Sequence, residues 1–311
     1  MRILMFGRGV IATIYGRVLA EAGHDVEFYV RPGRAAQYGA EVQLDWIDGR
    51  RKPLGRRVRE TFQTPLRESI DPGDGFDLIV LSVGHHRLAE AAAVLAPRLG
   101  TATVLVFGNV WDEPLTAVAP LPADQVVFGF PQAGGGVRDD GMLWGALLPS
   151  VIIGTAAASQ CPREQQVSGA FRQAGIGVRQ EKDMRGWLWL HFIADAGMFS
   201  QALRSGSLAK MIGDRRAFRD AFLTARELLP IVEARGVDLR RHRSALVPFR
   251  MPGAVAALSA RATVLVPLAQ RSLEGHTDPR APEALAVIDD TRSEARRLGI
   301  ATPRLDSQAE G

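Results

Sequence analysis

The chain has 311 residues, of which 46% are hydrophobic and 23% are charged, and its formal net charge is +4. These proportions are typical of a globular protein and exclude a disordered chain. The small positive excess comes without a long basic run interleaved with aromatic residues, which argues against nucleic-acid binding. The single cysteine, Cys161, excludes an internal disulfide and a cysteine-based metal site, and we expect no metal.

The first apolar run is too short for a secretion signal or a membrane span. It follows Met1 and Arg2 and stops at Gly7. Charge or glycine interrupts the longer apolar stretches elsewhere. We therefore expect a cytoplasmic protein with no membrane segment.

The first half of the chain alternates short apolar runs with helical patterns. A helix is predicted from Ile11 to Ala22, where apolar residues recur at helical spacing and Gly23 follows. Such alternation predicts an α/β domain, a doubly wound parallel sheet of the Rossmann type with helices on both faces. The predicted strands are 2–7, 25–30, 76–83, 101–107 and 125–130, with further extended pieces at 150–155 and 175–180.

The second half reads as helical throughout. Helices are predicted at 188–203, 214–235, 252–273 and 282–298. We therefore expect residues 1–181 to form the α/β domain and residues 182–311 to form an all-α domain.

A G-x-G-x-x-A pattern, Gly7 to Ala12, lies between the first predicted strand and the first predicted helix. Gly7 allows a tight turn, Gly9 allows close approach of a pyrophosphate, and Ala12 allows the helix to pack closely on the strand. The amides of Val10 and Ile11, at the helix start, suit phosphate oxygens. The alternative is a glycine-rich turn without a ligand.

The end of the second strand indicates which dinucleotide binds. An NAD site normally has an acidic residue there, whereas "FYVRPGR" offers Arg31 and Arg34. An arginine suits a 2′-phosphate, so we expect NADP(H). The alternative is that both are solvated loop arginines.

With these residues in place, the chain resembles the ketopantoate reductase (2-dehydropantoate 2-reductase) family of pantothenate biosynthesis. The likeness runs from "GRGVIATIYGRVLAEAGHDVEFYVR" to "EARRLGIATP". It implies an NADPH-binding Rossmann domain, a helical domain and an active site between them. The arginine that ends the second strand in this family falls on Arg31.

The catalytic positions of the family match in spacing but not in chemistry. The family helix resembles W-x-K-L-x-x-N-A-x-x-N, and its general-acid lysine falls on His191. Its substrate-binding asparagine falls on Asp195 and its second asparagine on Phe199. A further lysine, after the strand at 76–83, is replaced by Gly84. Ketopantoate turnover is therefore an open question.

By resemblance, three further residues of this chain correspond to substrate-binding residues of the family. Asn109 keeps the family's asparagine, in "GNVW", at a position that also borders the cofactor. Glu283 falls on the family's glutamate, and Ser272 falls on its serine with a shift of one residue.

His191 and Asp195 lie in the middle of an otherwise apolar stretch. At i and i+4 on a helix they share one face and can interact. The carboxylate would favour the protonated imidazole and fix its orientation, so His191 could give a proton to a carbonyl oxygen. The alternative is a satisfied structural pair.

The sequence thus predicts an NADPH-dependent reductase of a small 2-oxo acid or related carbonyl compound, similar to 2-dehydropantoate 2-reductase and possible as a homodimer. One alternative is an imine or opine-type reductase that uses the His191–Asp195 dyad on an amino-bearing substrate. Another is a non-catalytic NADPH-binding regulatory protein.

Overall fold

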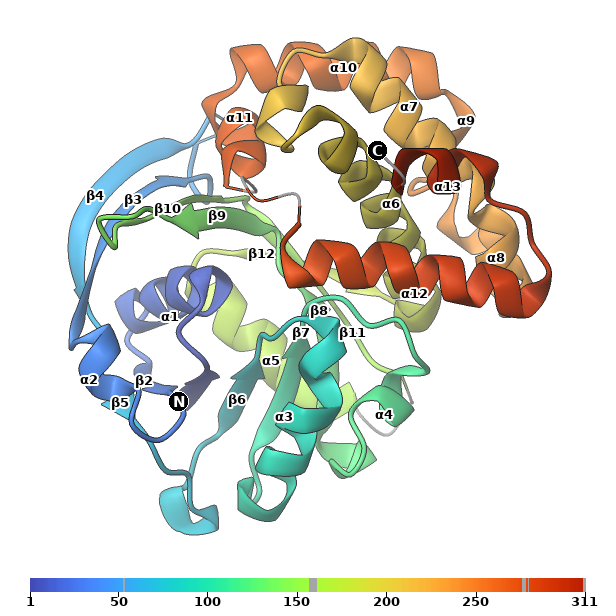
Figure 1. Cartoon of the computed structure of the whole chain (residues 1–311). Helices are drawn as coiled ribbons and strands as arrows, with labels where there is room; N and C mark the ends of the chain where they lie inside the picture. The colour runs from blue at the N-terminus through green and yellow to red at the C-terminus, as the bar shows by residue number, and fades with distance from the viewer. Residues whose placement is uncertain (53, 157–160, 276–277, 279, 310–311) are drawn as a thin grey trace. The chain divides into compact units, whose positions relative to one another are not determined.

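The computed structural model describes residues 1–52, 54–156, 161–275, 278 and 280–309. The chain divides into two units, which are drawn together in Figure 1. Unit 1 consists of residues 1–108 and 112–184, and unit 2 consists of residues 109–111 and 185–311. The three residues 109–111 therefore belong with the helical part of the chain.

The core of unit 1 is an eight-stranded sheet in the order β12-β11-β8-β7-β6-β1-β2-β5. Each strand predicted above is found in this sheet, which confirms the Rossmann-type class. The strands are β1 Arg2–Phe6, β2 Asp25–Tyr29, β5 Leu66–Arg67, β6 Leu78–Leu81, β7 Thr103–Phe107, β8 Val126–Phe130, β11 Ser150–Gly154 and β12 Gly177–Glu181.

The sheet is mixed, whereas the alternating pattern predicted a parallel one. β11 runs antiparallel to β8, and the other neighbouring pairs are parallel. A parallel neighbour needs a long crossover connection, usually a helix. β11 instead follows β10 (Leu143–Leu147) after two residues, and so it joins the sheet without a crossover helix.

Helices cover both faces of this sheet (Figure 1). α1 (Val10–Glu21) and α5 (Cys161–Gln173) share one buried core with inward side chains of the strands, whereas α3 (Leu88–Leu95) lies on the other face. Tyr15 of α1 is fully buried in that core, edge-on to Phe107 at 4.8 Å and to Phe171 at 5.8 Å. Two short helices, α2 (Ala35–Tyr38) and α4 (Pro114–Ala117), also belong to unit 1.

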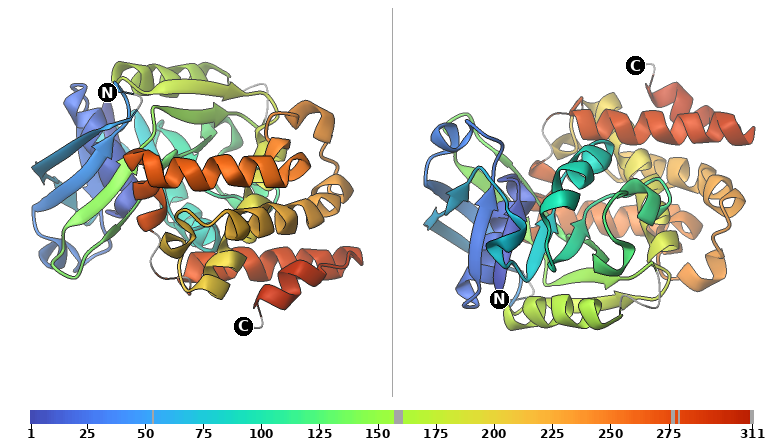
Figure 2. Two further views of the ribbon diagram at one scale, coloured as in Figure 1. Left: turned by 90° about the horizontal axis from the view of Figure 1, so that it is seen from above. Right: turned by 90° about the horizontal axis from the view of Figure 1, so that it is seen from below.

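A second sheet of four strands, which the sequence did not predict, packs on the outer side of α1 (Figure 2). Its order is β4-β3-β10-β9, with β3 Glu41–Asp48, β4 Arg56–Gln63 and β9 Ala133–Val137. Glycines permit the close approach: a Cβ at Gly135 would lie 3.0 Å from Val10, and one at Gly145 would lie 3.1 Å from Ile14. β9, "AGGGV", has no apolar alternation by which it could be recognised as a strand.

Asp45 of β3 is a fully buried acid in this small sheet. Both its oxygens accept from Arg57, at 2.8 and 2.5 Å, and Arg59, opposite it on β4, adds a bond at 3.2 Å. The hydrogen bonds from Arg57, supported by the charges of both arginines, lower the pKa of Asp45 to about 2 although burial opposes this shift. The ion pair therefore joins β3 to β4.

Unit 2 is helical (Figures 1 and 2). Its helices are α6 Met184–Ser205, α7 Arg215–Glu227, α8 Leu229–Ala234, α9 Val247–Arg250, α10 Pro252–Leu265, α11 Pro267–Glu274, α12 Pro282–Leu298 and α13 Pro303–Ala309. The predicted helix 282–298 is confirmed at both ends. The predicted helix 252–273 is wrong as one element: it bends by 96° between α10 and α11, where Pro267 lacks an amide hydrogen.

Among the described residues, no single helix has the length and apolar character needed to cross a membrane. The bent pair α10 and α11 meets that criterion jointly, by length and composition only.

We predict that Asp45→Asn destabilises unit 1 at pH 7 and that the loss disappears in acid. A folded-state pKa lowered from 3.8 to about 2 contributes stability that is present above pH 3.8 and lost as the pH falls to about 2. We expect a loss of about 1–2 kcal/mol at pH 7, discounted because Arg57 is half exposed. Urea unfolding at pH 7 and pH 2 measures it.

The matched control is Asp139→Asn, which removes the same charge at an exposed position. Equal stability of the Asp45 and Asp139 variants at pH 7 would contradict the assignment.

Candidate active site

The loop between β1 and α1 has the geometry of a phosphate-binding turn. Gly7 has a φ of +109°, which favours glycine, and its amide donates to the carbonyl of Tyr29 at 2.9 Å. Gly9 precedes the helix and has no side chain to cap it. A Cβ at Gly7 or Gly9 would meet no heavy atom of the described chain within 4 Å. The first amides of α1, those of Val10 and Ile11, thus lie beside space that suits an anion.

The closest packing of α1 on the sheet occurs at a residue that the sequence motif did not indicate. Ala12 is buried, as expected. One turn later, however, a Cβ at Gly16 would lie only 2.5 Å from the ring of Phe28 on β2. Gly16 therefore sets the approach of helix to strand, and glycine inside a helical pattern was the signal for it.

Arginines gather at the end of β2. Arg31 and Arg34 are exposed, and the guanidinium of Arg34 lies 6.0 Å from the ring centre of Tyr38. Arg8, inside the glycine motif, lies over the same ring at 5.3 Å and donates to the carbonyl of Glu41 at 2.7 Å. Burial lowers the pKa of Arg8. Arg8 stands at the first x of the G-x-G-x-x-A pattern, so the motif did not indicate it.

A carboxylate holds the backbone of this loop. Glu68, just after β5, accepts from the amide of Ala35 at 2.7 Å. Hydrogen bonds from the amides of Ala35 and then Gly33 lower the pKa of Glu68. The loop that carries Arg34 is therefore fixed by a contact within unit 1.

The loop that lacks the expected lysine follows β6, the strand next to β1. Gly84 precedes a turn of 3₁₀ helix, His85–Arg87. The rings of His85 and His86 lie edge to face, with their centroids 5.7 Å apart. Since β6 and β1 are parallel, this loop and the glycine turn leave the same edge of the sheet.

In unit 2, the structure brings the predicted dyad together on α6. His191 Nε2 lies 3.5 Å from Asp195 Oδ1, and both side chains are partly buried. The imidazole stacks on the indole of Trp187 at 5.1 Å, with the planes 11° apart. Two residues, each one helical turn from His191, thus orient its ring. Trp187 packs on the face of the imidazole, and Asp195 lies at its Nε2 edge.

Asn109 completes the dyad from a distant part of the sequence. Its Nδ2 donates to Asp195 Oδ2 at 2.9 Å, so each oxygen of the carboxylate has a different neighbour. Asn109 is 6% exposed, and its Oδ1 is buried without a hydrogen-bond partner among the described residues. Such an unsatisfied acceptor is uncommon in a folded protein.

An aromatic and arginine clamp holds residues 109–111 on the helical unit. Trp111 stacks on Phe192 of α6 at 4.4 Å, with the planes 16° apart. The guanidinium of Arg235 lies 4.3 Å from the ring centre of Trp111 and 3.6 Å from that of Trp189, and it donates to the carbonyl of Trp111 at 2.6 Å. The sequence gave no sign that Trp111 would meet α6.

Glu283 and Ser272 differ in their relation to the dyad. Glu283 lies in the first turn of α12, and the loss of hydration and the negative charge of Asp195 both raise its pKa. Ser272 donates to the carbonyl of Leu268 at 2.9 Å, a bond within α11.

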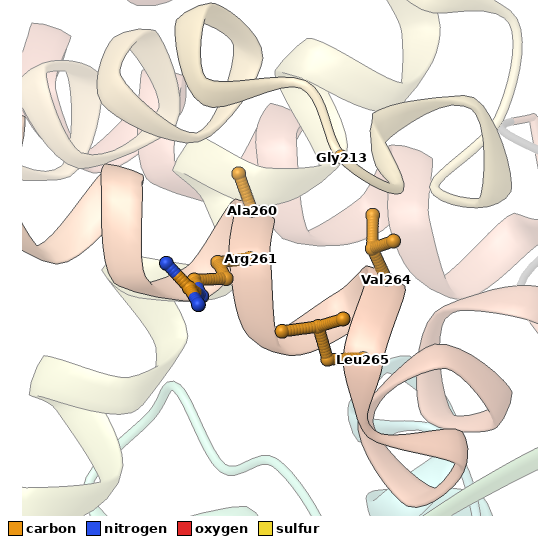
Figure 3. Close-up of a pocket in the computed structure, with 5 residues that line it drawn as sticks. All are labelled: Gly213, Ala260, Arg261, Val264 and Leu265. Carbon is orange, nitrogen blue, oxygen red and sulfur yellow. The ribbon is translucent and has the colours of Figure 1, made fainter.

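A separate apolar depression of about 360 Å³ lies on α10 (Figure 3). It contains none of the predicted site residues. Its lining consists of Gly213, Ala260, Arg261, Val264 and Leu265. Within the described part of the chain, no group of three or more His, Cys, Asp or Glu residues is placed to hold a metal.

This fold, with a glycine turn opening the first helix of a Rossmann-type sheet and a helical unit after it, is typical of dinucleotide-binding proteins. The family model described as ketopantoate reductase PanE/ApbA matches residues 3–156. By this match residues 3–156 are similar to the ketopantoate reductase family.

Solved structures share the fold along the whole chain. A 2-dehydropantoate 2-reductase from Geobacter metallireducens GS-15 is 17% identical, with a TM-score of 0.68 and coverage of 100% of this chain and 98% of that one. A probable 2-dehydropantoate 2-reductase from Bacillus subtilis is 16% identical, with a TM-score of 0.65 and coverage of 99% and 97%. The ternary structure of D-mandelate dehydrogenase with NADH and anilino(oxo)acetate is 14% identical, with a TM-score of 0.70 and coverage of 100% and 96%.

We predict that Arg235→Lys loosens residues 109–111. Lysine keeps the charge but loses the planar group that stacks on Trp111 and Trp189. We expect a loss of roughly 2 kcal/mol in the stability of unit 2 and faster hydrogen exchange at the amides of Asn109 and Val110. Arg240→Lys, at an exposed arginine of the same unit, is the control. Unchanged exchange at both amides would show that the clamp does not hold this segment.

Proposed function

We propose that this protein is an NADP(H)-dependent reductase that transfers hydride to a small 2-oxo acid or a related carbonyl compound. The observation that carries the proposal is the His191–Asp195–Asn109 array, because it stands at the positions that the family resemblance gives to catalysis. The match of residues 3–156 to the ketopantoate reductase family model and the oxidoreductases that share the fold support the same reaction class.

The residues of unit 1 fit a dinucleotide phosphate. Gly7 and Gly9 leave room beside the first amides of α1, and Arg31 follows β2 where a 2′-phosphate would need a cation. D-mandelate dehydrogenase has NADH in its printed complex, so the fold alone does not select the cofactor. The arginines at the end of β2, in place of an acid, favour NADPH here. When bound, the cofactor supplies the hydride.

The proton comes from His191 in this proposal. Protonated His191 gives its proton to the carbonyl oxygen as the carbon receives hydride, which forms the alcohol. Asp195 stabilises the imidazolium through its Oδ1, and Asn109 holds the other oxygen of Asp195. Trp187 keeps the ring from rotating. In this proposal an imidazole, whose orientation two neighbours determine, takes the role that the resemblance gives to a lysine.

We predict that His191→Ala lowers kcat for carbonyl reduction by about 10²- to 10⁴-fold, since general acid catalysis contributes on that order. NADPH affinity should stay within about twofold, because the glycine turn lies in unit 1. NADPH oxidation with ketopantoate and small 2-oxo acids gives kcat, and fluorescence titration gives the affinity. Full activity of the variant would remove His191 from the mechanism. NADPH binding without turnover by the wild type would favour a regulatory role.

We predict that Arg31→Ala weakens NADPH binding by about tenfold or more and leaves NADH binding nearly unchanged, because a charge-assisted contact to the 2′-phosphate is lost. Dissociation constants for both cofactors test this result. Arg98→Ala, an exposed arginine of the same unit, is the control. An equal loss for NADPH and NADH would contradict a 2′-phosphate contact.

A further inference from the structure

We propose that the cluster formed by Asn109, His191, Asp195 and Glu283 binds a protonated amine, so that the substrate is a small carbonyl compound bearing an ammonium group. This inference rests on the proposed function for the reduction of the carbonyl, and it adds the chemical class of the substrate. The binding group is the ammonium, and hydride and proton still go to the C=O carbon and oxygen.

The hydrogen-bond acceptors of the cluster suit an ammonium group. Asn109 donates one of its two Nδ2 hydrogens to Asp195, and its Oδ1 remains as an acceptor. That oxygen is buried and has no hydrogen-bond partner in the described part of the chain. Asp195 and Glu283, when ionised, are acceptors only, and an ammonium has three donors and no acceptor. The cluster and an ammonium are therefore complementary.

The charge of the cluster also favours a cation over an anion. The cluster contains two carboxyl groups and one imidazole, so even protonated His191 neutralises only one of the two when both are ionised. α12 packs on α6, since Val287 and Ile288 belong to the same buried core as Phe192. Glu283 lies one turn before Val287, and desolvation and the negative charge of Asp195 both raise its pKa. A cation between them would relieve this repulsion, whereas a substrate carboxylate would add to it.

Three ketones of nearly equal size test the proposal with the full chain saturated with NADP⁺, which cannot reduce them. Aminoacetone is cationic, butan-2-one is neutral and pyruvate is anionic, and all three share the CH₃–CO– group. Calorimetric titration measures binding independently of turnover. We expect aminoacetone to bind at least tenfold more tightly than butan-2-one, with pyruvate weakest. Equal binding of the three, or tighter binding of pyruvate, would overturn the proposal.

Two variants remove the negative charge with little change of shape. Asp195→Asn should abolish the preference for aminoacetone over butan-2-one, and Glu283→Gln, at an exposed position of α12, should reduce it severalfold. Asp289→Asn, also exposed on α12, changes the net charge equally and should keep the preference. Retention of the full preference in both the Asp195 and Glu283 variants would overturn the proposal, and Glu283→Gln alone decides it if the other variant does not fold.

Turnover of the same ketones separates this inference from the proposed function. Selective binding of aminoacetone without NADPH oxidation supports the amine site and contradicts the reductase. Oxidation of NADPH with all three ketones at equal kcat/KM supports the reductase and contradicts the amine site.

Discussion

The candidate site depends on one contact, the docking of residues 109–111 on the helical unit. β7 ends at Phe107, three residues pack with unit 2, and the chain then resumes unit 1 at Asp112. Trp111 is held between the ring of Phe192 and the guanidinium of Arg235. That anchoring brings Asn109 to Asp195, 86 residues later in the sequence. Without it, Asp195 would keep His191 and lose its second neighbour.

The fold could be predicted where the signal was local. Strand β1 and helix α1 follow from an apolar run, a glycine turn and helical spacing, and α12 begins at a proline and ends at Gly299 in the left-handed region. The small sheet could not be predicted in this way. Glycines dominate β9, and β4 alternates charged with partly buried residues, so the pairing of β3 with β10 depends on contacts about 100 residues apart. The break between α10 and α11 was readable at Pro267.

The candidate site, too, could be predicted only where its residues are close together in the sequence. His191 and Asp195 were predictable as neighbours because four residues on a helix make one turn, and the turn at Gly7 and Gly9 was predictable from its motif. The contacts of Arg8 and the contact of Asn109 with Asp195 were not, because each depends on elements that come together only in the fold. Ser272 had the weakest alignment, and its hydrogen bond to Leu268 lies within its own helix.

We propose that this chain transfers hydride from NADPH directly to a carbonyl carbon. The most direct test is deuterium transfer from NADPH labelled at either face of C4, with the ketone that oxidises the cofactor fastest. We expect an alcohol with one deuterium on the former carbonyl carbon, from one face of the cofactor only. NADPH oxidation that leaves no deuterium in the alcohol, or forms no alcohol, would contradict it.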